Sequence, residues 1–109
     1  MKPRFLEIIE VLETHKIYIE LYGGNPSLID LGLLQSALAQ PSMGSGEDFF
    51  HNNLYEMAAA YLFHISQNHS FIDGNKRTAL ACCLLFLKFN GINSNSLLKR
   101  AVGGHIKDK

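Results

Sequence analysis

The stretch HSFIDGNKR, residues 69–77, leads through Thr78 into ALACCLLFL, residues 79–87. The second part is apolar at every position, and a helix that is apolar all round packs in the middle of a bundle rather than on its surface. The polar residues just before it are therefore expected to lie at the mouth of a central helix. The sequence predicts an all-α bundle in which a loop ending near residue 75 precedes that buried helix.

The rest of the chain predicts further helices joined by loops. Apolar side chains recur at three- and four-residue steps in three segments, which is the spacing of one buried helical face. Asp30 is the expected N-cap of the second helix, and Asn53 with Glu56 resembles a capping box at the start of the third. His15 lies on the apolar face of the first helix and is predicted to be a core histidine hydrogen-bonded to a neighbouring loop. Residues 42–53 lack helical spacing and are interpreted as an irregular loop or small hairpin. The three helical segments are residues 4–22, ended by Gly23-Gly24; residues 31–40, stopped by Pro41; and residues 54–65; a short fourth one is expected at residues 96–102.

Composition and cysteine usage limit the class of protein. With 109 residues, 47% of them apolar and 18% charged, the chain fits one globular domain over residues 1–109. Lysine plus arginine equals aspartate plus glutamate at 10 each, so no net positive field favours direct binding of nucleic acid. Cys82 and Cys83 are adjacent, too close for an ordinary disulfide, and are expected to be reduced thiols. No signal-peptide pattern and no apolar run of membrane-spanning length is present, so a cytoplasmic protein without membrane contact is expected.

The start of the central helix carries an electrostatic conflict. A helix N-terminus exposes unpaired backbone N–H groups and a partial positive charge, yet Lys76 and Arg77 stand in its first turn. Cations are disfavoured there by about 0.3–1 kcal/mol each, and such a broken rule is typical of a functional site. A polyphosphate would supply the missing negative charge. Gly74 would let the backbone approach the phosphates, Asn75 would offer amide donors, and Arg77 would fork onto phosphate oxygens.

Two more residues of this stretch could act on such an anion. Asp73 could coordinate Mg²⁺ bridging the phosphates, and His69 could accept the proton of an attacking hydroxyl as general base. Each assignment has a structural alternative. Asp73 could be the N-cap of the helix, His69 a structural histidine, and Lys76 and Arg77 solvated cations. Phe71 is interpreted as the apolar anchor of the loop.

Residues 69–77 resemble the signature of the Fic/Doc superfamily, His-x-Phe-x-Asp/Glu-Gly-Asn-x-Arg. The Lys before the Arg, and the Thr-Ala-Leu that follows, make the stretch most similar to the death-on-curing (Doc) toxin branch, and the similarity extends over residues 5–91. The resemblance implies a Fic/Doc-type helical bundle with one catalytic base, one metal ligand and a set of phosphate-binding residues. By motif position these are His69 as the base, Asp73 as the Mg²⁺ ligand, and Gly74, Asn75, Lys76 and Arg77 as the phosphate-binding set.

The resemblance also implies an activity. Fic/Doc proteins transfer part of a nucleoside triphosphate such as ATP to a protein hydroxyl: most Fic proteins transfer AMP, whereas Doc toxins phosphorylate elongation factor Tu, with the nucleotide bound in reverse. The AMP-transferring branch carries a second arginine three residues beyond the first, and Leu80 stands at that position. Because an apolar side chain cannot bind a phosphate, we expect phosphoryl transfer. AMP transfer and a catalytically inactive nucleotide- or protein-binding module are the alternatives.

Regulation and departures from the family pattern complete these expectations. Many Fic proteins carry an inhibitory Glu followed by Gly or Asn, and none of the six glutamates here has either neighbour. We therefore expect inhibition by another chain, a small antitoxin with a disordered tail. Residues 42–53 resemble in position the flap that holds the target segment beside the catalytic histidine. Ser70 and Leu28-Ile29 depart from the family pattern and are not expected to touch the chemistry.

Overall fold

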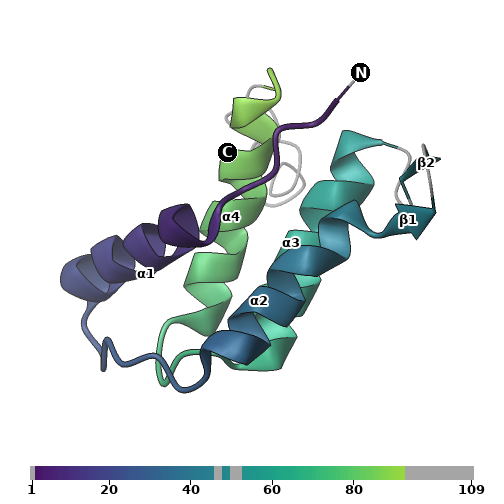
Figure 1. Cartoon of the computed structure of the whole chain (residues 1–109). Coiled ribbons are helices and arrows are strands. Elements are labelled where there is room, and N and C mark those ends of the chain that lie inside the picture. The colour runs from purple at the N-terminus through teal and green to yellow at the C-terminus, as the bar shows by residue number, and fades with distance from the viewer. Residues whose placement is uncertain (1, 46–47, 50–52, 93–109) are drawn as a thin grey trace, which may run out of the picture.

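The computed structural model describes residues 2–45, 48–49 and 53–92, and helices dominate this part of the chain (Figure 1). The predicted all-α bundle is confirmed, while the helix expected at residues 96–102 lies outside the described residues. None of the described helices is long and apolar enough to cross a membrane. The elements in chain order are α1 (Ile8–Tyr22), α2 (Leu31–Ala39), the 3-10 turn η1 (Gln40–Ser42), β1 (Gly44–Ser45), β2 (Asp48–Phe49), α3 (Leu54–Asn68) and α4 (Asn75–Phe89).

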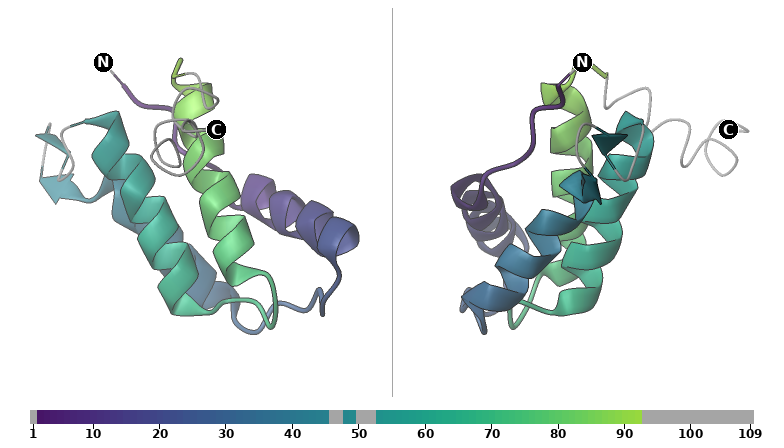
Figure 2. Two further views of the ribbon diagram at one scale, coloured as in Figure 1. Left: turned by 180° about the vertical axis from the view of Figure 1, so that it is seen from behind. Right: turned by 45° about the vertical axis from the view of Figure 1, so that its right-hand side comes forward.

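Helix α4 occupies the middle of the bundle, as its apolar sequence predicted. Figure 1 shows α4 between α1 on one side and α3 on the other, and the view from behind in Figure 2 shows the same order. Its inner face is buried, and the ring of Phe86 lies 5.2 Å from the ring of Tyr61 on α3. Leu80 is an exception, because 46% of its surface remains exposed. The N-terminus of α4 therefore opens where α1 and α3 both come close.

Side-chain caps set the starts of α2 and α3. Asp30 Oδ1 accepts a hydrogen bond from the Leu33 backbone N–H at 3.2 Å, and Asn53 Oδ1 accepts one from the Glu56 N–H at 2.8 Å. Both residues were predicted as caps. Helix α2 ends before Pro41, whose ring cannot continue the helix.

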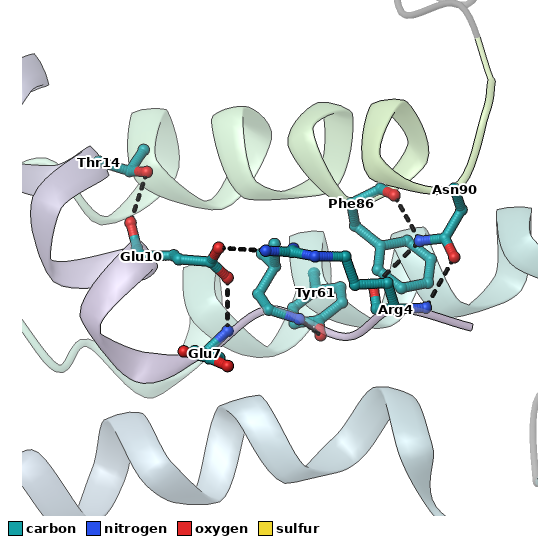
Figure 3. A network of polar contacts seen from close by, with 8 residues as sticks. Arg4, Glu7, Glu10, Thr14, Tyr61, Phe86 and Asn90 are labelled. Atoms are coloured by element: carbon teal, nitrogen blue, oxygen red, sulfur yellow. Dashed lines mark hydrogen bonds and ion pairs between the residues drawn. The ribbon is translucent and has the colours of Figure 1, made fainter. Parts of the chain in front are cut away.

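Helix α1 begins at Ile8 rather than at the predicted Arg4, because the residues before it are bound to other helices (Figure 3). The Arg4 backbone N–H donates to Asn90 Oδ1 at 2.7 Å, and Asn90 Nδ2 donates to the Arg4 carbonyl at 3.0 Å. The Leu6 N–H donates to the Tyr61 hydroxyl at 2.9 Å. These partners lie far away in the sequence, so helical periodicity could not reveal them.

Glu10, in the first turn of α1, binds the residues that precede the helix. Its carboxylate accepts the Glu7 backbone N–H at 2.8 Å and pairs with the Arg4 guanidinium at 2.6 Å (Figure 3). The Arg4 side chain and the Glu7 N–H together lower the pKa of Glu10. The stabilisation from these contacts is present at neutral pH and is lost as the pH falls through that lowered pKa.

The expected small hairpin is present, but it lies away from His69. β1 and β2 pair antiparallel, with Gly44 opposite Phe49 and Ser45 opposite Asp48. The strands adjoin the start of α3, whereas His69 follows its end. Figures 1 and 2 show β1 and β2 at the end of α3 that lies away from the loop into α4. A helix of this length separates its two ends by about 22 Å. The expectation that this segment forms a flap beside the histidine is therefore wrong for this structure.

The adjacent cysteines are reduced and belong to the core. Cys82 and Cys83 are free and buried on α4. Burial raises the pKa of the Cys82 thiol to about 12 and also raises that of Cys83. At neutral pH both side chains are therefore neutral packing groups rather than reactive thiolates.

Candidate functional site

The motif loop, residues 69–74, joins the end of α3 to the start of α4. His69 is the C-cap of α3, with φ 51° and ψ 51°, and its side chain is exposed. Among the described residues it is the one residue other than glycine with a positive φ. This left-handed conformation is disfavoured for a residue with a Cβ atom, and such strain is concentrated at functional positions.

The loop is fixed from inside by two aromatic rings and an amide. The ring of Phe71 is buried and stacks on the ring of His15, with centroids 3.6 Å apart and planes 11° apart. His15 Nε2 lies 2.7 Å from the Asp73 carbonyl oxygen. A carbonyl can only accept, so Nε2 carries the proton. The predictions that Phe71 anchors the loop and that His15 is a core histidine bound to a loop are both confirmed.

Asn75 also holds the loop. Its Oδ1 accepts the Phe71 backbone N–H at 3.1 Å, and its Nδ2 donates to the Phe71 carbonyl at 2.8 Å. The side chain is buried and faces the loop, so it is not the open amide donor that the sequence suggested. Direct contact of Asn75 with an anion would come from its backbone N–H, which has no acceptor within the helix at this first position.

The connector between α1 and α2, residues 23–30, supports the loop from outside. The Ile29 N–H donates to the Ser70 carbonyl at 2.7 Å, and the Ile72 N–H donates to the Ser27 carbonyl at 3.1 Å, around a bridge between Leu28 and Phe71. Figure 1 shows the two connections side by side at one end of the bundle. Leu28-Ile29 and Ser70 therefore help to hold the motif loop through their backbone, while the expectation that they do not touch the chemistry stays a prediction. Backbone pairing leaves no side-chain signal, which is why the sequence did not reveal it.

The N-terminus of α4 has no side-chain cap. Its N-cap is Gly74, no side chain accepts the free N–H groups of its first turn, and that turn contains no acidic residue. Lys76 and Arg77 stand in this first turn, as predicted, and both side chains are exposed. Gly74 has φ 84°, and a Cβ atom at this position would lie 3.3 Å from Ile19 Cδ1 and 3.4 Å from His15 Nε2. Glycine is therefore favoured here by its conformation, and a side chain would also pack tightly against Ile19 and His15.

Asp73 is not the N-cap of α4, because Gly74 holds that position, so the N-cap interpretation of this residue is wrong. Its Oδ2 accepts the Asn25 backbone N–H at 2.7 Å, and its side chain is exposed. The connector lies close to Asp73: a Cβ atom added to Gly24 would lie 3.1 Å from Asp73 Cβ and 3.3 Å from Asp73 Oδ2. Gly24 itself has φ 118°, so this close approach also depends on glycine.

A cleft of about 360 Å³ opens at this junction of α1, the connector and α4. The Arg77 guanidinium lies over the ring of Tyr22, with Cζ 4.5 Å from the ring centroid, at the border of the cleft. His69 is not among the residues that line it. The lining residues are Tyr18, Ile19, Tyr22, Gly23, Gly24, Asp73, Gly74 and Arg77.

The residues around the cleft fit Mg²⁺ only together with a phosphate ligand. Within the described part of the chain, no group of three His, Cys, Asp or Glu side chains could enclose a metal ion. Mg²⁺ is commonly bound through one or two carboxylates plus substrate phosphates and water. Asp73 offers one such carboxylate: its Oδ2 accepts the Asn25 N–H, and its second oxygen, Oδ1, could act as a ligand.

The helical bundle, the motif loop and the uncapped central helix together define a member of the Fic/Doc family. Residues 5–87 match the sequence profile of the Fic/DOC family, and the chain belongs to it.

Two Doc proteins are among its relatives. The chain is 39% identical over 71 residues to "Toxin Doc" of Mycolicibacterium smegmatis, an alignment that covers 65% of this chain and 55% of the relative. It is 35% identical over 83 residues to "Protein kinase doc" of Escherichia phage P1, covering 76% of this chain and 65% of the relative. The resemblance to the Doc branch is therefore confirmed. The matched segment spans less than two thirds of either relative's length.

Proposed function

We propose that this chain, acting as a single domain, is a toxin that transfers the terminal phosphate of a nucleoside triphosphate such as ATP to a protein hydroxyl. One observation carries the proposal: the uncapped start of α4, with Gly74 and Arg77, opens into a cleft that also contains Asp73. His69 is exposed on the same short loop. The name "Protein kinase doc" of one relative supports phosphate transfer as the proposed reaction.

The phosphates would occupy the N-terminus of α4. Backbone N–H groups of its first turn point out of the helix with a partial positive charge, and the exposed Lys76 and Arg77 add two cations. Asp73 would hold Mg²⁺ against the same phosphates, and when bound this ion neutralises charge on the phosphoryl group. The anion would also relieve the repulsion between these cations and the helix end.

His69 would act as the general base. Its imidazole accepts the proton of the target hydroxyl while the hydroxyl oxygen bonds to the γ-phosphorus. The bond from that phosphorus to the β–γ bridging oxygen breaks, and ADP leaves with the bond's electron pair. In support of this role, the backbone of the loop that carries His69 and Gly74 is held at Phe71 by Asn75 and by the stacked ring of His15.

Leu80 favours phosphate over AMP as the transferred group. It stands one helical turn after Arg77 and is 46% exposed, so it could meet a ligand. An apolar side chain there gives no charge-assisted hydrogen bond to a further phosphate. The first turn of α4 therefore supplies two cations, Lys76 and Arg77, for a polyphosphate. The next turn offers no cation at Leu80 to bind a further phosphate.

Target and partner follow from the Doc resemblance and are part of the proposal. The target would be a translation factor in the cytoplasm, elongation factor Tu, and the inhibitor a small antitoxin whose disordered tail folds on binding. No direct contact with nucleic acid is required, in keeping with a formal net charge of +0.

The test uses ATP labelled at either the α- or the γ-phosphorus, with Mg²⁺ and purified elongation factor Tu or a bacterial lysate. The γ-label should appear on a protein and the α-label should not, and His69→Ala should lower transfer by about 100-fold or more. His64→Ala is the matched control, because this partly buried histidine lies on α3 outside the cleft. Transfer of the α-label would show AMP transfer, and no transfer of either label would contradict the proposal.

A further inference from the structure

His15 contacts the motif loop at three residues, although it lies on α1, far away in the sequence. Its ring stacks on the ring of Phe71, with centroids 3.6 Å apart, and its Nε2–H donates to the Asp73 carbonyl at 2.7 Å. It also lies against Gly74, where an added Cβ atom would be 3.4 Å from His15 Nε2. Packing in the core explains the contact with Phe71, but it does not explain the hydrogen bond to Asp73.

The core itself does not need a histidine at this position. The side chain of His15 is only 3% exposed, and the other buried residues of α1 are the aliphatic Val11 and Ile19. Burying a polar group costs free energy unless it is hydrogen-bonded, so an aliphatic residue would suit the packing better. Its partner, Asp73, is an exposed residue, and a carbonyl group there can be satisfied by water. Neither packing nor the needs of the carbonyl therefore account for the imidazole.

Asp73 is held at both ends by the same part of the chain. Its backbone carbonyl accepts the His15 Nε2–H, and its side-chain Oδ2 accepts the Asn25 backbone N–H at 2.7 Å. The two donors belong to α1 and to the connector that follows it directly. Residues that bind metal ions are commonly oriented in this way by hydrogen bonds from neighbouring groups. The two contacts fix the backbone and the carboxylate of Asp73 where this residue lines the cleft.

We infer that His15 is a positioning residue for the metal ligand: its hydrogen bond to the Asp73 carbonyl holds the Asp73 carboxylate in the orientation that binds Mg²⁺. The stacked ring of Phe71 fixes the plane of the imidazole, and with it the direction of the Nε2–H. His15 does not line the cleft, so it acts through Asp73 and not on the ion or the nucleotide. This inference rests on the proposed function and adds a residue outside the motif on which metal binding depends.

The test replaces His15 by two side chains of similar size that differ in hydrogen bonding. His15→Leu removes both the ring and the donor, whereas His15→Gln removes the ring and keeps an N–H donor. Calorimetric titrations of the full chain with ATP, in saturating Mg²⁺ and in EDTA, give the ratio of the two ATP affinities. By the thermodynamic cycle, a change in this ratio between variants is the change in Mg²⁺ affinity of the ATP complex. The ratio should fall about tenfold or more in His15→Leu and return toward the parent value in His15→Gln.

Melting temperatures separate this role from a purely structural one. Glutamine buries a polar amide and leucine does not, so His15→Gln should melt no higher than His15→Leu. The variant that is no more stable should thus be the one that keeps the effect of Mg²⁺, whereas a packing role predicts the same order for both measurements. Val11→Ala is the matched control, because Val11 is buried one turn earlier on α1 and does not line the cleft. Its Tm should fall while the affinity ratio stays at the parent value.

The outcomes that contradict the inference differ from those that contradict the proposed function. An unchanged ratio in His15→Leu, or an equal fall in His15→Leu and His15→Gln, would overturn the positioning role and leave the proposed metal site standing. A parent protein whose affinity for ATP does not depend on Mg²⁺ would reject that metal site, and the inference with it. Absence of ATP binding by the parent in either condition would reject the proposed function as a whole.

A measurement on the parent protein decides the matter if both variants fail to fold. With ¹⁵N-labelled histidine, the Nε2 resonance of His15 should shift when Mg²⁺ is added to the ATP complex, because an ion bound to Asp73 changes the hydrogen bond at its carbonyl. The resonances of His64 should not move, since this residue is partly buried on α3 and does not line the cleft. A His15 resonance that stays in place would overturn the inference.

Discussion

His69 is predicted to combine opposite effects on stability and activity. Its φ of 51° places a residue with a Cβ atom in the left-handed region, which is disfavoured by about 1–2 kcal/mol. Replacement by glycine removes that strain, while the greater freedom of glycine in the unfolded chain offsets about 0.4–1 kcal/mol. The side chain is exposed, so little packing is lost. His69→Gly should therefore raise the free energy of unfolding by about 0–1.6 kcal/mol, with about 0.8 kcal/mol at the centre of this range.

This change is large enough to measure. For a domain of this size, 1 kcal/mol corresponds to a shift of about 4–8 °C in Tm, so the central value predicts that His69→Gly melts about 3–6 °C above the parent. Transfer of the γ-label should fall by about 100-fold or more, because glycine offers no nitrogen to accept the proton. His69→Ala should lose the same activity without the gain in Tm, since alanine keeps the Cβ atom.

Thermal melts of the three proteins, with transfer assays on the same samples, check this reasoning. Gly74→Ala serves as the reverse control, because it introduces a Cβ atom at φ 84° and should lower Tm. A His69→Gly protein that melts below the parent would refute the idea that the left-handed backbone is strained. A His69→Gly protein that still transfers phosphate at the parent rate would refute the assignment of the base.

Three further predictions concern the rest of the site. Asp73→Asn keeps an oxygen for the Asn25 N–H, so Tm should barely change, while Mg²⁺-dependent transfer should fall sharply in a γ-label assay; unchanged transfer would reject Asp73 as the metal ligand. Arg77→Gln removes an unfavourable charge at the helix end, about 0.3–1 kcal/mol, and a cation–π contact of about 0.5–1 kcal/mol, so without nucleotide Tm should stay near that of the parent. The rise in Tm with saturating ATP and Mg²⁺ should be lost in this variant, and an undiminished rise would show that Arg77 does not bind the nucleotide. Ser70→Ala removes a buried hydroxyl that has no hydrogen-bond partner, so it should melt no lower than the parent, and a clear fall in Tm would point to an unseen partner for this hydroxyl.

The sequence predicted the parts of the site that depend on local pattern. The apolar run at residues 79–87 placed α4 at the centre, and the adjoining polar residues placed the loop at its mouth. The roles of His15 and Phe71 also followed, since a buried polar residue on a helical face needs a partner.

What the sequence did not predict depends on contacts between distant segments. The connector holds the motif loop by backbone hydrogen bonds, which any sequence can make. The Asn25 backbone N–H also donates to the Asp73 carboxylate, 48 residues further along the chain. In the sequence, Tyr18 and Tyr22 belong to an ordinary amphipathic helix, and only the fold shows that they line the same cleft as Arg77. The side-chain role of Asn75 was misjudged because its partner, Phe71, becomes available only when the loop closes.

The distribution of irregular features is itself an argument for where the protein acts. Elsewhere the helices follow local rules, with Asp30 and Asn53 capping α2 and α3 through their side chains. Around the motif loop these rules are broken four times. The backbone of His69 is in the left-handed region, and Ser70 Oγ and Thr78 Oγ1 are buried without hydrogen-bond partners. Helix α4 starts without a side-chain cap and carries two cations in its first turn. Each of these four departures lowers the stability of the fold. They fall within ten residues, although the same chain caps its other helices in the ordinary way, so stability does not explain them. A ligand that supplies negative charge at this helix end would compensate for the uncapped N–H groups and the cations, and the proposed role of His69 as a base facing that ligand would account for the strain at this residue.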